Sequence, residues 1–390
     1  MNFTTQEYSA RLSNVKNKMS EKGLDLLILS DPSNMNYLTG YDGWSFYVPQ
    51  GVIVAIDKDE PIWFGRKQDS NGARITTFLK DENILGYPEN LIQSPPSHPY
   101  DYVANYIHEN KWANKNIGVE MDSYYYTAEN HERLVKNCPN AKFINGHLLV
   151  NWIRYIKSET EIDYMKQGAK LVQAGMQTAY NEIKPGVKQS FVAGKIQETL
   201  LGGNEETQIG GEYAGLNMIL ASGKSASASH LTPTDKKFSE NEGTIIELGG
   251  VKHRYHCALS RTVYIGKPDS KIDDTLKITN EGVEKAIEST KPGNTCHDVA
   301  VAFWSVLEKY GLEKESRCGY SIGLGYPPDW GEHTLSIRKN EMTLLHPNVT
   351  YHLMAGMWMD TWGLEISESI RVTENGCELF CDFPRSLHIV

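Results

Sequence analysis

The chain has 390 residues, of which 40% are hydrophobic and 23% are charged, a profile typical of a globular protein long enough for two domains. Its net charge of −10 argues against nucleic acid or an anionic membrane surface as the main partner. No apolar run in the sequence approaches the roughly 20 residues that a membrane-spanning helix needs.

The first residues and the cysteines both indicate a cytoplasmic protein. The opening stretch "MNFTTQEYSARLSNVKNKMSEKG" is polar and amphipathic, which predicts a helix over about residues 5–23 and not a secretory signal. The six cysteines show no CxxC pair or other zinc spacing, so we expect reduced thiols; they are Cys138, Cys257, Cys296, Cys318, Cys377 and Cys381.

Up to about residue 154, short apolar runs alternate with helical patterns. The stretches "LDLLILS", "VIVAID", "PIWFG" and "NIGVEM" predict buried strands, and "YDYVANYIHENKW" predicts a helix between them. Strands that alternate with helices favour a sheet covered on both faces. We therefore predict an α/β domain over residues 1–154.

A long helical pattern marks the start of a second domain, residues 155–390. The stretch from residue 149 to 186 predicts one continuous helix that ends at Pro185–Gly186, with Ser158 and Glu161 as a capping box. A helix over 187–201, a strand pair over 245–266 and two helices over 273–311 follow, and β segments continue to the end. Two "helix then Pro-Gly" units, "NEIKPG" and "ESTKPG", hint at an internal duplication.

Glu247 is the one acid in the apolar run "TIIELGG" of the strand pair. Burying an unpaired carboxylate costs several kcal/mol or shifts its pKa. Glu247 therefore either ends a strand in solvent or has a chemical role, and the run alone leaves both interpretations open.

The order of the elements in the second domain resembles the pita-bread fold of the creatinase, prolidase and methionine aminopeptidase family. The resemblance rests on "KSETEID", "ASGKSASASH" with "LTP", "SRTVYIG", the two Pro-Gly units and "GLEISESIRVTENG", which together span most of residues 150–375 in family order. It implies an N-terminal creatinase-like α/β domain followed by a C-terminal pita-bread α+β domain.

The family's peptidases bind two metal ions with two Asp, one His and two Glu. By resemblance, the positions of the first Asp, the second Asp, the penultimate Glu and the last Glu are Glu247, Ala258, Met354 and Ser367 in this chain. The Gly-rich turn of the metal-binding His reads "CGYSIGLGY" and contains no His. Such residues cannot hold two hard or borderline cations, so we expect neither a metal nor a cofactor, as in the metal-free creatinase branch.

A narrower set of stretches resembles the ectoine hydrolases, which open the cyclic amidine ring of ectoine to an N-acetylated diaminobutyrate. These stretches are "DPSNMNYLTGYDGWSFYVPQ", "WFGRKQDSNGA", "IGVEMDSYYY", "RYHCALSRT", "GYPPDWGE" and "WGLEISESI". The resemblance implies that Glu247 pairs with the amidinium and acts as nucleophile or as general base. It also implies that His230 transfers a proton to the leaving nitrogen, and that Glu365, in preference to Glu368, holds a ring N–H.

Aromatic and polar residues outside these positions are candidates for binding the rest of the substrate. Trp44, Phe46 and Tyr47 lie in the apolar loop 41–49, which in the creatinase branch reaches the partner's site; we expect a homodimer with loop 41–49 contributed across the interface. Packing on its own domain is the alternative. Candidates for binding the substrate carboxylate are Arg66, His352 and backbone N–H groups. Candidates for the wall of the site are Trp358, Asp360 and Trp362, with packing in the core as the alternative.

Three other functions stay open on the sequence. A creatinase-type amidinohydrolase and an X-Pro peptidase share the fold, although a peptidase needs the metal ligands that this chain lacks. A non-catalytic pita-bread module that binds peptides belongs to another class, and the retention of His230 and Glu247 argues against it. A functional link to a downstream deacetylase is a further expectation, because the expected product carries an acetyl group.

Overall fold

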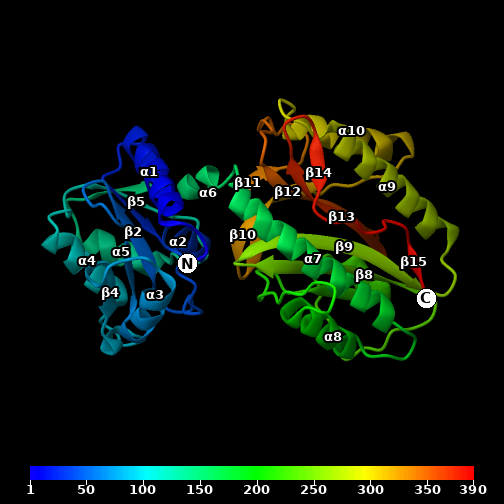
Figure 1. Cartoon of the computed structure of the whole chain (residues 1–390), viewed down its shortest axis with the longest axis horizontal. Helices are drawn as coiled ribbons and strands as arrows, with labels where there is room; N and C mark the ends of the chain where they lie inside the picture. Colours follow the sequence, from blue (N-terminus) through cyan, green and yellow to red (C-terminus); the bar gives the residue numbers. More distant parts are fainter. The chain divides into compact units, whose positions relative to one another are not determined.

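A computed structural model describes residues 1–390, which divide into two units, Met1–Arg154 and Tyr155–Val390 (Figure 1). The first unit is built on a six-stranded sheet with the order β4-β3-β2-β1-β5-β6. The β1–β2 and β2–β3 pairs are antiparallel and the other pairs are parallel. The strands are β1 (Leu26–Leu29), β2 (Gly51–Ala55), β3 (Ile62–Arg66), β4 (Ile84–Tyr87), β5 (Asn116–Val119) and β6 (Lys142–Asn145).

Six helices accompany this sheet. All residues of β1 and β2 are buried, which explains why both strands read as continuous apolar runs without alternation. The helices are α1 (Thr5–Glu21), α2 (Pro32–Thr39), α3 (Ser70–Thr76), α4 (Pro99–Glu109), α5 (Ala128–Asn137) and α6 (Leu149–Ile153). Short 3₁₀ turns lie at η1 (Lys67–Asp69), η2 (Asp81–Asn83) and η3 (Glu89–Leu91).

The second unit is built on a nine-stranded sheet whose main path is β14-β13-β12-β10-β9-β8-β7, with β11 paired to β10 and β15 paired to β9. Its strands are β7 (Ile219–Ser222), β8 (Glu242–Lys252), β9 (Tyr255–Ile265), β10 (Gly319–Tyr326), β11 (Asp329–Ser336), β12 (Thr350–Trp358), β13 (Gly363–Val372), β14 (Cys377–Leu379) and β15 (His388–Ile389). Its helices are α7 (Glu159–Glu182), α8 (Gln189–Gly202), α9 (Ser270–Ser289) and α10 (Cys296–Lys309), and the 3₁₀ turn η4 (Gly223–Ser227) follows β7.

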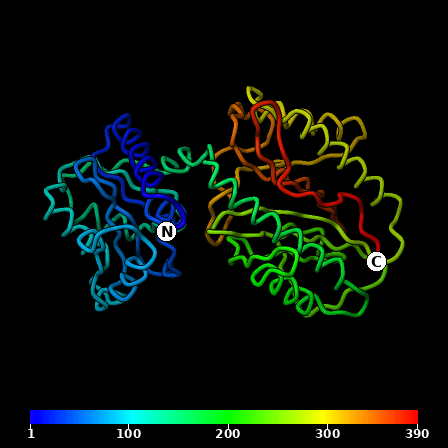
Figure 2. Tube along the Cα trace, in the orientation of Figure 1, coloured from blue at the N-terminus to red at the C-terminus, as the bar shows by residue number.

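Each half of this sheet has its own pair of helices and its own apolar core. Helix α7 packs on β8 and β9 and on α8, whereas α9 packs on α10 and contacts β12 and β13 (Figure 2). The approach of α7 to β8 requires glycine, because a Cβ on Gly168 would lie 2.7 Å from the carbonyl oxygen of Gly250. The helices therefore cover one side of the two long hairpins, β8–β9 and β12–β13, and leave their other side for polar residues.

The long helix predicted from residue 149 is two helices in the structure. Helix α6 ends at Ile153, and α7 begins at Glu159 with the predicted capping box of Ser158 and Glu161. The chain is extended between them, because Ile156 forms a β-bridge with Val349. None of the helices has the length and apolarity that crossing a membrane requires.

Candidate active site

Glu247 lies in the middle of β8 and is only 4% exposed. It faces Ser260 of β9 in the strand register. Its neighbours Ile246 and Leu248 point to the opposite side, into the core under α7. The strand reads as an apolar run because both of its faces are covered, and the interpretation of Glu247 as a solvent-exposed strand end is wrong.

Glu365 and His352 lie on the two strands of the other hairpin, and both are buried. His352 pairs with Ser369 and Glu365 pairs with Gly356 in the β12–β13 register. The Nδ1 atom of His352 is 3.9 Å from Oε1 of Glu247, which brings the two hairpins together at these side chains. The structure thus joins three residues that the sequence analysis named separately.

The environment of the acid pair raises the pKa of both carboxyl groups. Burial raises the pKa of Glu247 well above its usual range, and the charges of Glu365 and Asp329 add to the rise. Burial also raises the pKa of Glu365 to about 7, opposed by the Ser260 side chain and the ammonium of Lys314. Burial lowers the pKa of His352 to about 3, so its ring is neutral at physiological pH. Two buried acids therefore stand beside an uncharged imidazole.

Several buried polar atoms on this side of the sheet have no hydrogen-bond partner. They include Oε1 of Glu247, Oε1 of Glu365, Nε2 of His352 and Nε1 of Trp358. A buried polar group without a partner costs roughly 1–3 kcal/mol, so such groups are rare in folded proteins. These atoms are two carboxylate oxygens and two ring nitrogens, and they lie on neighbouring strands. Together they indicate a site for a small polar ligand.

Three residues near this site were not identified from the sequence. Tyr320 of β10 lies 3.1 Å from Nδ1 of His352 and accepts a hydrogen bond from the indole N–H of Trp330 at 2.9 Å. Lys314 donates to the carbonyl of Gly356 at 2.7 Å, and burial lowers its pKa to about 8. Tyr320 lies in the motif "CGYSIGLGY" and Trp330 in "PPDWGE", but no spacing in the sequence connects these two residues to His352.

The residues at the family's metal positions do not fit a metal pair. Ala258 and Met354 offer no hard donor, and the hydroxyl of Ser367 accepts a hydrogen bond from the backbone N–H of Ser260 at 2.7 Å. The hydroxyl of Ser369 bonds both backbone groups of Ala258. No group of three or more His, Cys, Asp or Glu side chains in the structure is arranged to hold a metal ion.

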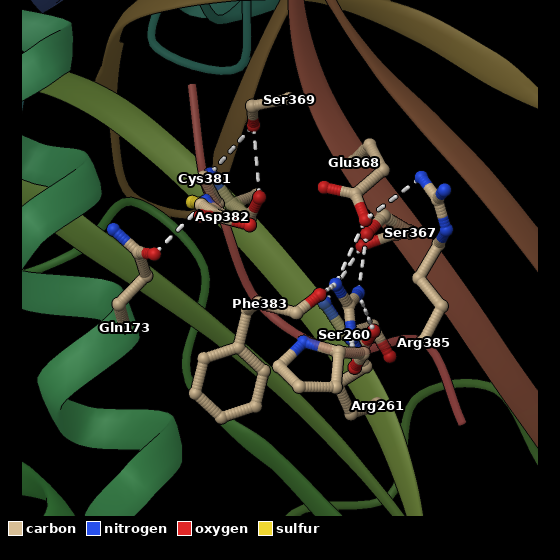
Figure 3. Close-up of polar contacts among 12 residues, drawn as sticks. Gln173, Ser260, Arg261, Ser367, Glu368, Ser369, Cys381, Asp382, Phe383 and Arg385 are labelled. Atoms are coloured by element: carbon tan, nitrogen blue, oxygen red, sulfur yellow. Dashed lines mark hydrogen bonds and ion pairs between the residues drawn. The ribbon is translucent and has the colours of Figure 1, made fainter. Parts of the chain in front are cut away.

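Glu368, the less favoured acid in the sequence analysis, has a different environment from Glu365. It is 1% exposed and accepts a hydrogen bond from Arg261 at 2.8 Å, with Arg385 at 3.5 Å (Figure 3). Arg261 also donates to the carbonyls of Phe383 and Pro384. Two guanidinium groups thus neutralise Glu368, and this network holds the C-terminal segment against β9 and β13.

His230, Asp360 and Trp362 lie outside this cluster. His230 follows η4 and is exposed, with its Nδ1 atom 3.2 Å from the Ser229 hydroxyl. Asp360 is exposed in the turn between β12 and β13. Trp362, in the same turn, packs at the edge of the core under α9 and α10. Trp358 packs against the small cluster around Ile245, on the same face of the β12–β13 hairpin as Glu365, and its N–H has no partner. The roles predicted for His230 and Asp360 stay predictions.

The aromatic loop belongs to the first unit. Trp44 is 57% and Tyr47 is 70% exposed, whereas Phe46 is half-buried with its ring centroid 5.7 Å from that of Tyr125. Arg66 forms a bidentate ion pair with Glu89, which leaves it less suited to a substrate carboxylate than the sequence suggested.

Comparisons with known proteins agree with this architecture. Residues 163–374 match the model of metallopeptidase family M24, and residues 11–156 match that of the creatinase/prolidase N-terminal domain. The prolidase of Thermococcus sibiricus superposes with a TM-score of 0.85 at 16% identity and covers 99% of this chain and 100% of its own. The predicted fold, a creatinase-like α/β domain followed by a pita-bread domain, is confirmed.

Two relatives align over almost the whole chain. The ectoine hydrolase of Halomonas elongata is 45% identical over 393 residues, which cover 99% of this chain and 98% of the relative. An uncharacterized hydrolase/peptidase of Sinorhizobium fredii is 40% identical and covers 99% and 98%. The chain therefore belongs to metallopeptidase family M24, a family of hydrolases, and carries the creatinase/prolidase N-terminal domain.

Proposed function

We propose that the protein hydrolyses the cyclic amidine ring of ectoine by a metal-independent reaction centred on Glu247. The similarity to the Halomonas elongata ectoine hydrolase supports this substrate. The observation that carries the proposal is the buried pair of Glu247 and Glu365, each with an unpartnered oxygen, in a fold whose peptidase ligand positions hold Ala258, Met354 and Ser367. A cationic ring supplies the positive charge that such an acid pair needs.

Ring opening needs attack on the amidine carbon that bears the methyl group and then cleavage of one ring C–N bond. In one route, the Glu247 carboxylate attacks this carbon, and water later breaks the resulting ester-like adduct. In the other route, Glu247 takes a proton from the attacking water. The products are the same, an N-acetylated diaminobutyrate, and a mass increase on Glu247 after rapid quenching would identify the first route.

The leaving nitrogen needs a proton. Two groups are suited to supply it: His230, as the resemblance implies, and Glu365, whose raised pKa leaves it partly protonated at neutral pH. The exposed position of His230 next to η4 requires that its loop close over the bound ring. Glu365 already lies in the site and is also suited to hold a ring N–H.

We further propose a homodimer in which loop 41–49 covers the partner's site. Exposed aromatic side chains as large as those of Trp44 and Tyr47 are of the kind that interfaces bury. The six free thiols fit a reducing cytoplasm. The product's acetyl group implies a following deacetylation step.

The experiment that tests this function compares three substrates. Purified protein is incubated with ectoine, creatine or an X-Pro dipeptide, with and without a chelator, and products are measured by mass spectrometry. We expect hydrolysis of ectoine alone, unaffected by the chelator. Dipeptide cleavage that stops on chelation and returns with manganese or zinc would instead identify a peptidase.

A further inference from the structure

A chain of hydrogen bonds joins three strands next to the acid pair. The indole N–H of Trp330 in β11 donates to the Tyr320 hydroxyl in β10 at 2.9 Å. That hydroxyl lies 3.1 Å from Nδ1 of His352 in β12. Trp330 and His352 are both fully buried, and their rings lie 6.3 Å apart in an edge-on arrangement. The three side chains therefore fix one another.

The indole N–H of Trp330 is the first donor in this series of hydrogen bonds. An indole nitrogen only donates, so the Tyr320 oxygen must accept from Trp330 and its own proton is free to point elsewhere. His352 Nδ1 is the other hydrogen-bond partner of this hydroxyl in the structure. If the hydroxyl proton points at Nδ1, this one arrangement gives the Tyr320 hydroxyl both an acceptor and a donor partner and leaves Nδ1 as the lone-pair nitrogen of the ring.

We propose that Trp330 and Tyr320 are positioning residues that hold His352 as its Nε2–H tautomer and so present a neutral, buried N–H donor to the carboxylate of the substrate. Nε2 is buried and has no partner within the protein, which leaves this donor for a ligand. The inference of the tautomer rests on the contacts of Trp330, Tyr320 and His352. The inference that the substrate carboxylate accepts the hydrogen bond from Nε2–H rests on the proposed function. The lowered pKa of His352, caused by burial, keeps the ring in this neutral form at physiological pH.

The charges around the site fit a division in which the two acids bind the amidinium end of the substrate and His352 binds its carboxylate. The amidinium end of the ring carries only donors and needs acceptors, which Glu247 and Glu365 provide. The carboxylate end needs a donor and would be repelled by both acids. His352 lies beside Glu247 but offers an N–H, so it is suited to the anionic end. A ring in the other tautomer would present a lone pair to this anion and weaken binding.

The tautomer is measured first, in the ligand-free protein. The ring nitrogens of ¹⁵N-histidine-labelled protein are observed by NMR, and the His352 signals are identified by their loss in His352→Gln. We expect a protonated Nε2 and an unprotonated Nδ1. Tyr320→Phe should give a mixture of tautomers. The control is Tyr351→Phe, which removes a buried hydroxyl from the neighbouring residue of the same strand, where it contacts Thr290 and not His352.

The effect on binding is measured with two substrates, ectoine and the same cyclic amidine without its carboxylate. For ectoine, Tyr320→Phe should raise KM by the inverse of the fraction of chains that keep the Nε2–H tautomer, about twofold for an equal mixture, with a much smaller change in kcat. For the analogue KM should not change. Tyr351→Phe should leave the ratio of the two KM values unchanged.

The outcomes separate this proposal from the proposed function. A proton on Nδ1 in the wild-type protein, or shifts that Tyr320→Phe leaves unchanged, overturns the positioning role. A tautomer change with parallel KM changes for both substrates overturns the carboxylate as acceptor. If ectoine is not hydrolysed at all, the proposed function fails, and the NMR result still decides the tautomer.

Discussion

Binding of a cationic ring to the acid pair should expel a proton from the protein. In the free protein, burial raises the pKa of Glu365 to about 7 and that of Glu247 well above its usual range, which favours the protonated form of both acids near neutral pH. An amidinium pairs with a carboxylate and not with a carboxylic acid, so Glu247 must lose its proton. We therefore expect a net release of protons on binding at pH 7, and an affinity that rises with pH until the acid pair is ionised in the free protein.

The measurement is titration calorimetry with a hydrolysis-resistant cyclic guanidinium carboxylate. The apparent binding enthalpy is compared at pH 7 in buffers of small and large ionisation enthalpy, and the slope gives the number of protons released. Glu247→Gln is the control, because an amide has no proton to lose and the slope should fall toward zero. If the wild-type heats do not depend on the buffer, Glu247 is already ionised in the free protein and the argument from burial is wrong.

Four further predictions concern single residues and the assembly. Glu247→Gln should abolish turnover with little change in thermal midpoint; more than a tenth of the wild-type rate would move the chemistry to another residue. His230→Ala should lower kcat by about 10²–10⁴-fold if His230 delivers the proton, and a smaller loss would favour Glu365 as the donor. The folded pKa of Glu365 lies above its unfolded value of 4.5, so its buried charge destabilises the protein by about 3 kcal/mol above pH 7 and not below pH 4.5. The gain in unfolding free energy of Glu365→Gln over wild type should thus grow from pH 5 to pH 8 in chemical denaturation. A gain independent of pH would contradict this argument. Mixing inactive Glu247→Gln chains with inactive chains carrying Trp44→Ala and Tyr47→Ala should restore activity if the site is shared, whereas no recovery after proven subunit exchange would place loop 41–49 elsewhere.

Features that depend on local sequence could be predicted. The capping box of Ser158 and Glu161 and the long hairpin around Glu247 both follow from residues close together in the chain. The break between α6 and α7 could not, because it depends on a bridge from Ile156 to Val349 and on the buried ion pair of Lys157 with Glu332. Those partners lie far away in sequence, and helical periodicity continues through the break.

The residues of the site also divide into those that the sequence identifies and those that it does not. Glu247 was identified because a carboxylate in an apolar run stands out in a sequence, and Glu365 was identified through the resemblance to the family. Tyr320 and Trp330 were not, because a tyrosine and a tryptophan in β strands are ordinary core residues until the register of β10, β11 and β12 brings them to His352. The burial of Glu368 likewise depends on Arg261, which lies 107 positions earlier in the chain.

The serine hydroxyls between β9 and β13 have an evolutionary consequence. Ser367 occupies a position where a peptidase would carry a ligand, and Ser367 and Ser369 bond the backbone of Ser260 and Ala258. Reverting Ser367→Glu alone would leave a buried N–H without its acceptor and add an acid beside two others, with Ala258 and Met354 still unable to ligate. This single substitution would therefore be destabilising before any metal could bind. A change of this site toward metal binding would require several positions to change together.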